Sequence, residues 1–359
     1  MHEPRAYLVG IGGALPPFSY TNAELAPYYN IDEATAERYA RATGIESRHS
    51  VVDLPGGRRQ RVLCETLASD AAKIALERAE VSPNDVDMVV TAASLFDYIV
   101  PALGSRLLKR LGIREALTFD LYGGCAQFMH GVSLATNYIK SGLASTVLVT
   151  ASEALTSWNR GVRYPVDAFI FGDSGAAWVI TSLPRTTDKP VWEIHETTAG
   201  TLSEHLGEPT EVVVQPITGW KEPFDLFLEP DATVDERMAG LHPDDRHEYR
   251  WIHNTALARR VAGFGLVEGF ERVTKATEPS GGLVVPHQGT KPVLDDVAGS
   301  LPEGWTVLEN LANRGNLSTA CVPMAMYDHP ETCLEHETIV ATAVGVGFSF
   351  AAARLTRDI

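Results

Sequence analysis

Residues 116–152 read ALTFDLYGGCAQFMHGVSLATNYIKSGLASTVLVTAS, and this stretch decides the fold. The apolar run at 116–121 predicts a buried strand, and two glycines then allow a sharp turn. Apolar side chains recur on one helical face over residues 125–141, which predicts a helix that ends at Gly142. Residues 145–152 predict a second buried strand. A strand, a helix and a strand in this order are typical of α/β proteins.

The same alternation extends to both sides of this stretch. Towards the N-terminus we expect strands at 6–11 and 86–93 and helices at 65–79 and 102–111. Towards the C-terminus we expect strands at 175–182, 191–197, 281–287, 306–311, 337–345 and 350–356, and helices at 249–277, 291–301 and 316–328. Because the strands are continuously apolar, the pattern predicts α/β layers with mostly parallel, buried sheets.

The chain divides into two halves. The stretch SLPRTTDKP at 182–190 carries prolines and charges, and it separates a half at 1–184 from a half at 185–359. Between about 200 and 250 the periodicity weakens, so we expect an irregular insertion there that covers a pocket.

Composition limits the class of protein. The 359 residues include 46 acidic and 30 basic side chains, for a formal net charge of −16, which disfavours nucleic acids and anionic membranes as partners. We find no apolar run of about 18 residues and expect no secretory signal. Cys64, Cys125, Cys321 and Cys333 show neither close pairing nor metal-ligand spacing. The sequence therefore predicts a cytoplasmic protein without a bound metal.

Cys125 is the candidate nucleophile. It stands at the start of the predicted helix, where free N–H groups and the positive end of the helix dipole gather. This setting favours the thiolate, so we expect the pKa of Cys125 to lie below its usual value of about 8.5. The same N–H groups can hold an oxyanion. The alternative, a small buried core residue, is the interpretation adopted for the other three cysteines.

Two further polar side chains occupy comparable places. His287, in LVVPHQG, follows a valine-rich strand at the end where open α/β sheets place functional groups. Asn316, in NRGNLSTACVP, begins a predicted helix, where it could also serve as an N-cap. A single histidine or asparagine is often structural. A thiol, an imidazole and an amide at three strand ends together predict an active site.

Several strings of residues resemble the signature blocks of one known family. These are GGCAQF at 123–128, FGDSGAA at 171–177, VVPHQG at 284–289 and RGNLSTACVP at 314–323, with TGIESRH at 43–49 before them and AVGVGF at 343–348 after them. Their order and spacing are similar to those of the ketoacyl-ACP synthase III family of the thiolase superfamily, which includes members of natural-product pathways. The resemblance covers nearly the whole chain outside 200–250.

The resemblance implies a thiolase-like fold, with two similar βα halves in a five-layered αβαβα arrangement, and a homodimer. Cys125 would accept an acyl group as a thioester. His287 and Asn316 would hydrogen-bond the carbonyl of a malonyl-type thioester and stabilise the enolate left by loss of carbon dioxide. The backbone N–H groups of Cys125 and Val346 would form the oxyanion hole. The substrates would be thioesters of acyl carrier protein or coenzyme A, with no other cofactor.

The positions that hold coenzyme A in this family differ here. The tryptophan and two arginines that bind its adenine fall on Arg38, Ala42 and Pro165, with Arg41 and Arg163 close enough to substitute in part. We therefore expect the acyl donor to be carried often by a carrier protein.

Such a carrier is typically acidic, so an acidic enzyme needs a local basic patch to bind it. Arg259 and Arg260 are the candidates for docking it, and a solvated helix face is their alternative interpretation.

The acyl pocket differs as well. Val100 stands where short-chain members carry a phenylalanine that blocks the tunnel, so we expect an acyl group larger than acetyl. Refilling of this space by Phe96 or Tyr98 is the alternative. Gln127 replaces a small residue usual near the cysteine; it either packs against a helix or adds a polar contact near the thioester.

The leading hypothesis is an acyltransferase that loads Cys125 and condenses the acyl group with a malonyl-type thioester. One alternative is an acyltransferase of the same fold that acylates a hydroxyl, an amine or a carrier thiol without forming a carbon–carbon bond. A second is a non-catalytic partner subunit of a synthase, and a third is a cysteine hydrolase. Asn316 favours condensation, because an acidic residue there would help the histidine act as a general base.

Overall fold

The computed structural model describes residues 4–54, 58–59, 63–98, 100–157, 168–184, 190–202, 212–216, 249–253 and 255–358. Two five-stranded half-sheets form its frame. The first has the order β7 (Leu117–Tyr122), β6 (Met88–Ala93), β8 (Thr146–Glu153), β9 (Ser174–Thr181) and β1 (Tyr7–Ala14). The second has the order β14 (Trp305–Val307), β13 (Gly282–Pro286), β15 (Thr338–Gly345), β16 (Ser349–Asp358) and β10 (Val191–Thr201).

The two half-sheets repeat one pattern of strand directions. In each order above, the first two neighbouring pairs are parallel and the next two are antiparallel. β1 and β10 join the half-sheets through the pairs Tyr7–Glu193 and Leu8–Trp192, giving one ten-stranded sheet. The prediction of two similar halves is thus confirmed.

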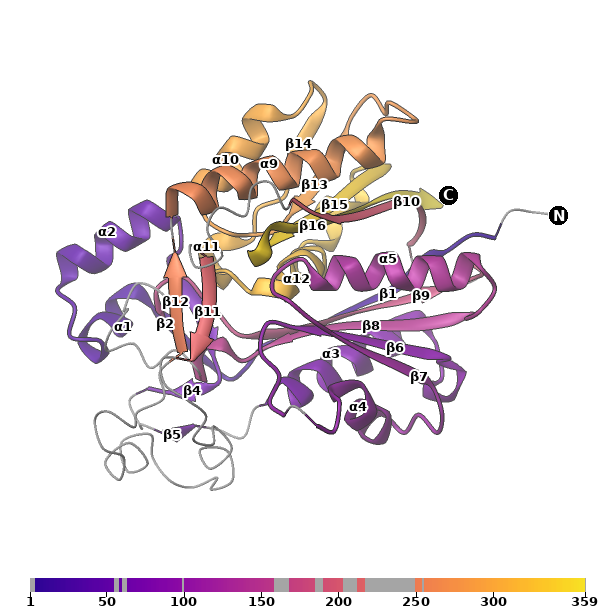
Figure 1. The fold of residues 1–359 in the computed structure, drawn as a ribbon, viewed down its shortest axis with the longest axis horizontal. Helices are drawn as coiled ribbons and strands as arrows, with labels where there is room; N and C mark the ends of the chain where they lie inside the picture. Colours follow the sequence, from indigo (N-terminus) through magenta and orange to yellow (C-terminus); the bar gives the residue numbers. More distant parts are fainter. Residues whose placement is uncertain are drawn as a thin grey trace.

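Helices complete five layers (Figure 1). α5 (Gln127–Lys140) and α12 (Cys321–Asp328) lie between the half-sheets and contact strands of both. α3 (Cys64–Ala79) and α4 (Leu103–Leu111) cover the outer face of the first half-sheet, and α9 (Thr255–Thr274) and α10 (Lys291–Ser300) cover that of the second. The predicted αβαβα arrangement is confirmed.

The largest hydrophobic cluster fills the middle layer. It joins side chains of α5 and α12 to the inward faces of both half-sheets, and Phe128 packs edge-on against Trp178 with 5.2 Å between ring centroids. Burial of these apolar side chains holds the two halves together and fixes the ends of α5 and α12.

Smaller elements lie around this frame. They are β2 (Phe18–Thr21), α1 (Asn22–Tyr28), α2 (Glu33–Thr43), β3 (Ser47–Ser50), β4 (Val52–Asp53), β5 (Arg58–Arg59), β11 (Val212–Pro216), β12 (Tyr249–His253), α11 (Leu311–Arg314) and α13 (Pro330–Leu334), with short 3-10 turns η1 (Pro83–Asp85), η2 (Leu155–Ser157), η5 (Ser318–Ala320) and η6 (Val346–Phe348). None of the helices described is both long and apolar enough to cross a membrane.

The prediction of mostly parallel sheets was wrong. Antiparallel pairs make up the centre of the sheet, where β8, β9, β1, β10, β16 and β15 follow one another. Only the turn Val346–Phe348 separates β15 from β16, and parallel neighbours would need a long crossover connection.

The helix predicted over 249–277 was wrong at its start. Residues 249–253 form β12, which pairs with β11, and the helix α9 begins at Thr255. The aromatic residues Tyr249 and Trp251 are two positions apart with Arg250 between them, which is a strand period. The helix predicted over 316–328 begins as the turn η5 and becomes α12 at Cys321. Most of the predicted insertion at 200–250 lies outside the described residues.

Candidate active site

Cys125 lies in the turn between β7 and α5. Gly123 and Gly124 have φ values of 153° and 96°, which an L side chain rarely adopts, so the chain can reverse sharply before the cysteine. α5 begins at Gln127, two residues after the start that the sequence predicts. The thiol therefore stands just before the N-terminus of a buried helix.

The turn after β15 packs directly against this cysteine. A Cβ on Gly345 would lie 2.9 Å from the backbone nitrogens of both Cys125 and Ala126, and a Cβ on Gly124 would lie 2.8 Å from Cγ2 of Val346. Only glycines at 124 and 345 allow the two backbones to approach so closely. The turn that carries Val346 therefore lies directly against the backbone of Cys125.

His287 follows β13 and is buried. Its backbone N–H donates to the carbonyl of Thr342 at 2.8 Å, which holds it beside β15. The next side chain, Gln288, donates to the carbonyls of Pro286 and Leu308 at 2.8 and 3.1 Å. These bonds fix the backbone at the end of the strand, whereas Nδ1 of the imidazole has no hydrogen-bond partner.

Asn316 lies before η5 and is also buried. Its N–H donates to the carbonyl of Ile170 at 2.9 Å, which ties the second half to the first. Its Oδ1 accepts the backbone N–H of Ser318 at 2.8 Å, so the amide group of the same side chain is directed elsewhere.

Ser318 is the residue around which the three predicted side chains meet. Its hydroxyl donates to Sγ of Cys125 at 3.3 Å, its N–H donates to Asn316, and its backbone shares a hydrogen bond with the His287 imidazole. Its φ of 48° is in the left-handed region, which is uncommon for serine. The structure thus brings the thiol, the imidazole and the amide together around a residue that the sequence analysis did not single out.

The expected lowering of the thiol pKa was wrong. Burial raises the pKa of Cys125 to about 11, because the thiolate loses its contact with water, and the hydrogen bond from Ser318 opposes this only in part. Burial also lowers the pKa of His287 to about 4. Both side chains are therefore neutral at neutral pH in the resting protein.

Glu153 carries a buried carboxyl group near Cys125. The sequence did not indicate it as a site residue. It ends β8, and its Oε1 accepts the N–H of Ser94 at 3.0 Å, the N–H of Thr319 at 3.2 Å and the hydroxyl of Thr319 at 2.7 Å. Burial raises the pKa of Glu153 to about 7. The hydroxyls of Ser94 and Ser318 lie 2.5 Å apart.

The predicted pocket residues lie further out. Phe96 is half-buried and packs against Tyr122, with 6.2 Å between ring centroids. The side chain of Val100 is exposed in the single chain, at 78%. Gln127 folds back over the glycine turn, since a Cβ on Gly123 would lie 2.7 Å from its Nε2.

The arginines considered for substrate binding are on the surface. Arg41 of α2 pairs with Glu37 at 3.3 Å, and Arg38 donates to the hydroxyl of Thr35 at 3.3 Å. Ala42 is an exposed residue of the same helix, whereas Arg163 and Pro165 lie outside the described residues. On α9, Arg259 forms two hydrogen bonds with Asp296, at 2.7 and 2.8 Å, and Arg260 is exposed.

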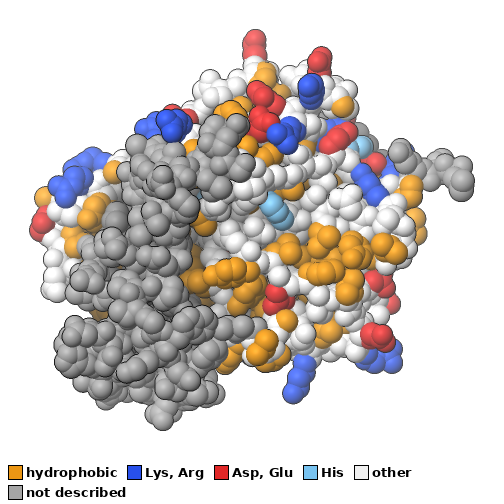
Figure 2. All heavy atoms as spheres, in the orientation of Figure 1, with side chains coloured by type: hydrophobic (Ala, Val, Ile, Leu, Met, Phe, Trp, Pro, Cys, Tyr) orange, Lys and Arg blue, Asp and Glu red, His pale blue; other side chains and the backbone are white. Residues whose placement is uncertain are grey.

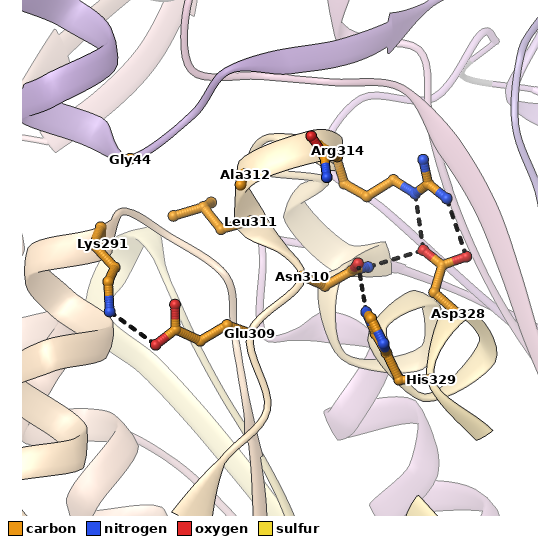
Figure 3. Close-up of a pocket in the computed structure, with 10 residues that line it drawn as sticks. Gly44, Lys291, Glu309, Asn310, Leu311, Ala312, Arg314, Asp328 and His329 are labelled. Atoms are coloured by element: carbon orange, nitrogen blue, oxygen red, sulfur yellow. Dashed lines mark hydrogen bonds and ion pairs between the residues drawn. The ribbon is translucent and has the colours of Figure 1, made fainter. Parts of the chain in front are cut away.

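A separate pocket of about 460 Å³ lies between α2, α10, α11 and the end of α12 (Figure 3). Its polar groups bind one another: Arg314 pairs with Asp328 at 2.8 Å, and Lys291 pairs with Glu309 at 2.8 Å on the other side. None of the predicted site residues lines it. Within the described part of the chain, no three His, Cys, Asp or Glu side chains are grouped so as to hold a metal ion.

Comparison with protein families matches both halves of the chain. Residues 119–200 match the model for 3-oxoacyl-[acyl-carrier-protein (ACP)] synthase III, and residues 280–357 match the model for the C-terminal part of the same enzyme. The first match includes Cys125 and Glu153, and the second includes His287 and Asn316.

Individual relatives extend this similarity over nearly the whole chain. Beta-ketoacyl-[acyl-carrier-protein] synthase III 2 of Bacteroides thetaiotaomicron is 26% identical over 362 residues, covering 98% of this chain and 96% of its own. The crystal structure of 3-oxoacyl-(acyl carrier protein) synthase III from Pseudomonas aeruginosa superposes with a TM-score of 0.76 at 22% identity, covering 98% of both chains. The priming β-ketosynthase of a polyketide biosynthetic pathway gives a TM-score of 0.76 at 24% identity, with 99% and 98% covered.

Proposed function

The chain belongs to the 3-oxoacyl-[acyl-carrier-protein] synthase III family, and we propose that it transfers an acyl group through Cys125 and joins it to a malonyl-type thioester by decarboxylative condensation. The observation that carries this assignment is the meeting of the thiol, the imidazole and the amide around Ser318. A half-buried thiol with neutral polar partners suits exchange between thioesters.

In the first step, the sulfur of Cys125 attacks the carbonyl carbon of the acyl donor. The N–H groups of Cys125 and Val346 hold the negative charge on the carbonyl oxygen, because the glycines at 124 and 345 bring these two donors together. The carbon–sulfur bond of the donor then breaks, and its thiol leaves with the proton. The product is an acyl-cysteine.

In the second step, the malonyl-type thioester loses carbon dioxide and becomes an enolate. His287 and Asn316 hydrogen-bond its carbonyl oxygen; the Oδ1 of Asn316 is occupied by Ser318, which leaves the amide N–H groups for the substrate. The enolate carbon attacks the acyl-cysteine, the new carbon–carbon bond forms, and Cys125 is released.

Partners and location follow from the same assignment. The acyl donor is a thioester of a carrier protein or of coenzyme A, and Arg260 and Arg259 of α9 are the surface proposed to bind an acidic carrier. The enzyme works in the cytoplasm, consistent with four free cysteines.

A homodimer forms through β7, an edge strand whose residues Leu117 and Tyr122 are exposed at 47% and 68%. Figure 2 shows hydrophobic side chains gathered on the face that carries α5 and β7. In that dimer the exposed Val100 would meet the partner's acyl tunnel, so Val100→Phe should exclude long acyl groups first. Equal loss for every chain length would contradict this role.

Intact-protein mass spectrometry tests the assignment. After incubation with acyl thioesters, the wild-type protein should gain the mass of the acyl group, and Cys125→Ala should gain none. Adding a malonyl-carrier thioester to the acylated protein should then release carbon dioxide. A protein that is acylated but releases no carbon dioxide would instead be an acyltransferase to a hydroxyl, an amine or a thiol.

A further inference from the structure

A line of hydrogen-bonding groups connects the Cys125 thiol to the buried carboxyl of Glu153. The Ser318 hydroxyl contacts Sγ of Cys125 at 3.3 Å, and the hydroxyl of Ser94 lies 2.5 Å from that of Ser318. The Ser94 N–H donates to Oε1 of Glu153 at 3.0 Å, which holds the Ser94 side chain beside the carboxyl, and the Ser94 side chain helps to lower the pKa of Glu153 against the effect of burial. Three side chains from β8, the end of β6 and η5 thus form one continuous path.

The carboxyl at the end of this path is in an unusual environment. Glu153 is fully buried; its Oε1 accepts from Ser94 and Thr319, whereas its Oε2 has no hydrogen-bond partner. The titratable groups that face it are the thiols of Cys64 on α3, Cys125 before α5 and Cys321 on α12. A buried carboxylate that faces thiols gains little from ionisation.

We propose that Glu153 takes up the proton of the Cys125 thiol through the hydroxyls of Ser318 and Ser94. In the resting structure Ser318 donates to Sγ; for the transfer its hydroxyl first turns to Ser94, so that Cys125 donates to Ser318, Ser318 donates to Ser94, and Ser94 donates to the carboxylate. As the S–H bond breaks, each oxygen passes on its proton, and all three hydrogen bonds reverse. The result is a thiolate that accepts from Ser318 and a neutral carboxylic acid, with one proton moved and no charge gained. This step rests on the proposed role of Cys125 as nucleophile.

The path gives the thiol a proton acceptor, which its other neighbours do not provide. With a pKa near 7, Glu153 is ionised in part of the population at neutral pH and can accept a proton, whereas the low pKa of His287 makes it a weak base. The thiol itself is far from ionised in its buried place. Glu153 acts on the thiol through the two serines and is therefore a positioning residue.

Alkylation of Cys125 by iodoacetamide, followed by peptide mass spectrometry across pH 5.5–9.5, tests the proposal without any substrate. The wild-type rate should rise through an inflection near pH 7. In Glu153→Gln this inflection should disappear, and the rate at pH 8 should fall by about 10-fold or more. Ser94→Ala should do the same, although it keeps the backbone bond from Ser94 to Glu153.

Asp87→Asn is the matched control. Asp87 accepts the N–H groups of Ser145 and Thr146 at the opposite end of β8, so it too holds this strand but is not on the path. Its pH profile should equal that of the wild type. If the inflection persists in Ser94→Ala or in folded Glu153→Gln, or disappears equally in Asp87→Asn, the proposal is overturned. If Glu153→Gln does not fold, Ser94→Ala decides alone. Failure of the proposed function would appear separately, as wild-type Cys125 that is alkylated but never acylated.

Discussion

The two halves of the molecule share one topology but carry different chemistry at matching positions. β6 is followed by Ser94, and its counterpart β13 is followed by His287. β8 ends at Glu153, and its counterpart β15 ends at Gly345. The first half therefore provides groups that can carry a proton, where the second half provides an imidazole and a closely packed backbone.

The turns before the two central helices differ in the same way. In the first half, two glycines with positive φ allow the chain to turn before Cys125. In the second half, Ser318 itself adopts a positive φ, and bonds from Asn316 and from Glu153 through Thr319 hold it there. The glycines of the first turn tolerate a positive φ without strain, whereas the positive φ of Ser318 in the second turn is held by hydrogen bonds. The comparison suggests that the first half carries the acyl group and the second half polarises the other substrate.

The largest expected effect separates these two roles. His287→Ala and Asn316→Ala should lower condensation by about 10³-fold, because each removes a donor to the enolate oxygen. Both variants should still acquire the acyl group on Cys125 at a rate close to that of the wild type. Rates of carbon dioxide release and of acyl-enzyme formation, measured on the same preparations, give the two numbers. Equal loss of both rates would show that the halves do not divide the reaction.

A smaller effect, on acyl loading, is expected from a substitution at Gly345, where the two halves are in contact. In Gly345→Ala the added Cβ would meet the backbone nitrogens of Cys125 and Ala126 at 2.9 Å, so the turn after β15 must move away. Acyl loading should fall by about 10²-fold, since a displacement of the oxyanion donors affects the transition state directly. Gly299→Ala, on the exposed end of α10 where nothing lies within 4 Å, is the control. Normal loading in Gly345→Ala would exclude Val346 from the oxyanion hole.

The last prediction concerns how the free energy of unfolding depends on pH. It has the smallest effect on turnover, and it tests the comparison of the two halves most sharply. Glu153 has a raised pKa in the folded protein, so its contribution to stability is present below about pH 4.5 and is lost as the pH rises to about 7. His287 has a lowered pKa, so its contribution is present above about pH 6.5 and is lost as the pH falls to about 4. Each of these contributions to the free energy of unfolding amounts to about 3 kcal/mol.

Urea unfolding at several pH values measures both contributions. Glu153→Gln should remove the loss of stability between pH 4.5 and 7, and His287→Gln should remove the loss between pH 6.5 and 4. The wild-type free energy of unfolding should change little between pH 5 and 6.5, where the two contributions oppose each other. Parallel curves for the wild type and Glu153→Gln would mean that this carboxyl has an ordinary pKa.

The sequence predicted the layers and the three central side chains for a physical reason. Strand and helix periods are local, and a glycine pair before a cysteine marks a turn that only glycine tolerates. Cys125, His287 and Asn316 each stand at such a local boundary. The start of α9 was mispredicted because residues 249–253 pair with β11, and part of the antiparallel centre was missed because β1 pairs with β9 and β10, which are far from it in the chain.

Ser94, Glu153 and Ser318 were missed because no spacing links them. Each is an ordinary polar residue, and their meeting depends on β6, β8 and η5 lying side by side. The rule that selected His287, a polar residue after a buried strand, applies equally to Ser94 and Glu153. The thiol pKa was mispredicted for a different reason: the sequence indicates a helix N-terminus but does not measure how far the sulfur is withdrawn from water.

The division of the site between the halves also has a consequence for the nascent polypeptide. Cys125 leaves the ribosome long before His287, Asn316 and the glycine turn at 345 have been synthesised. Until then the sulfur has neither the second oxyanion donor nor Ser318, and the central helix α5 lacks half of its packing. On the proposed mechanism, acyl transfer can begin only after the turn Val346–Phe348 has been synthesised and the two halves have docked.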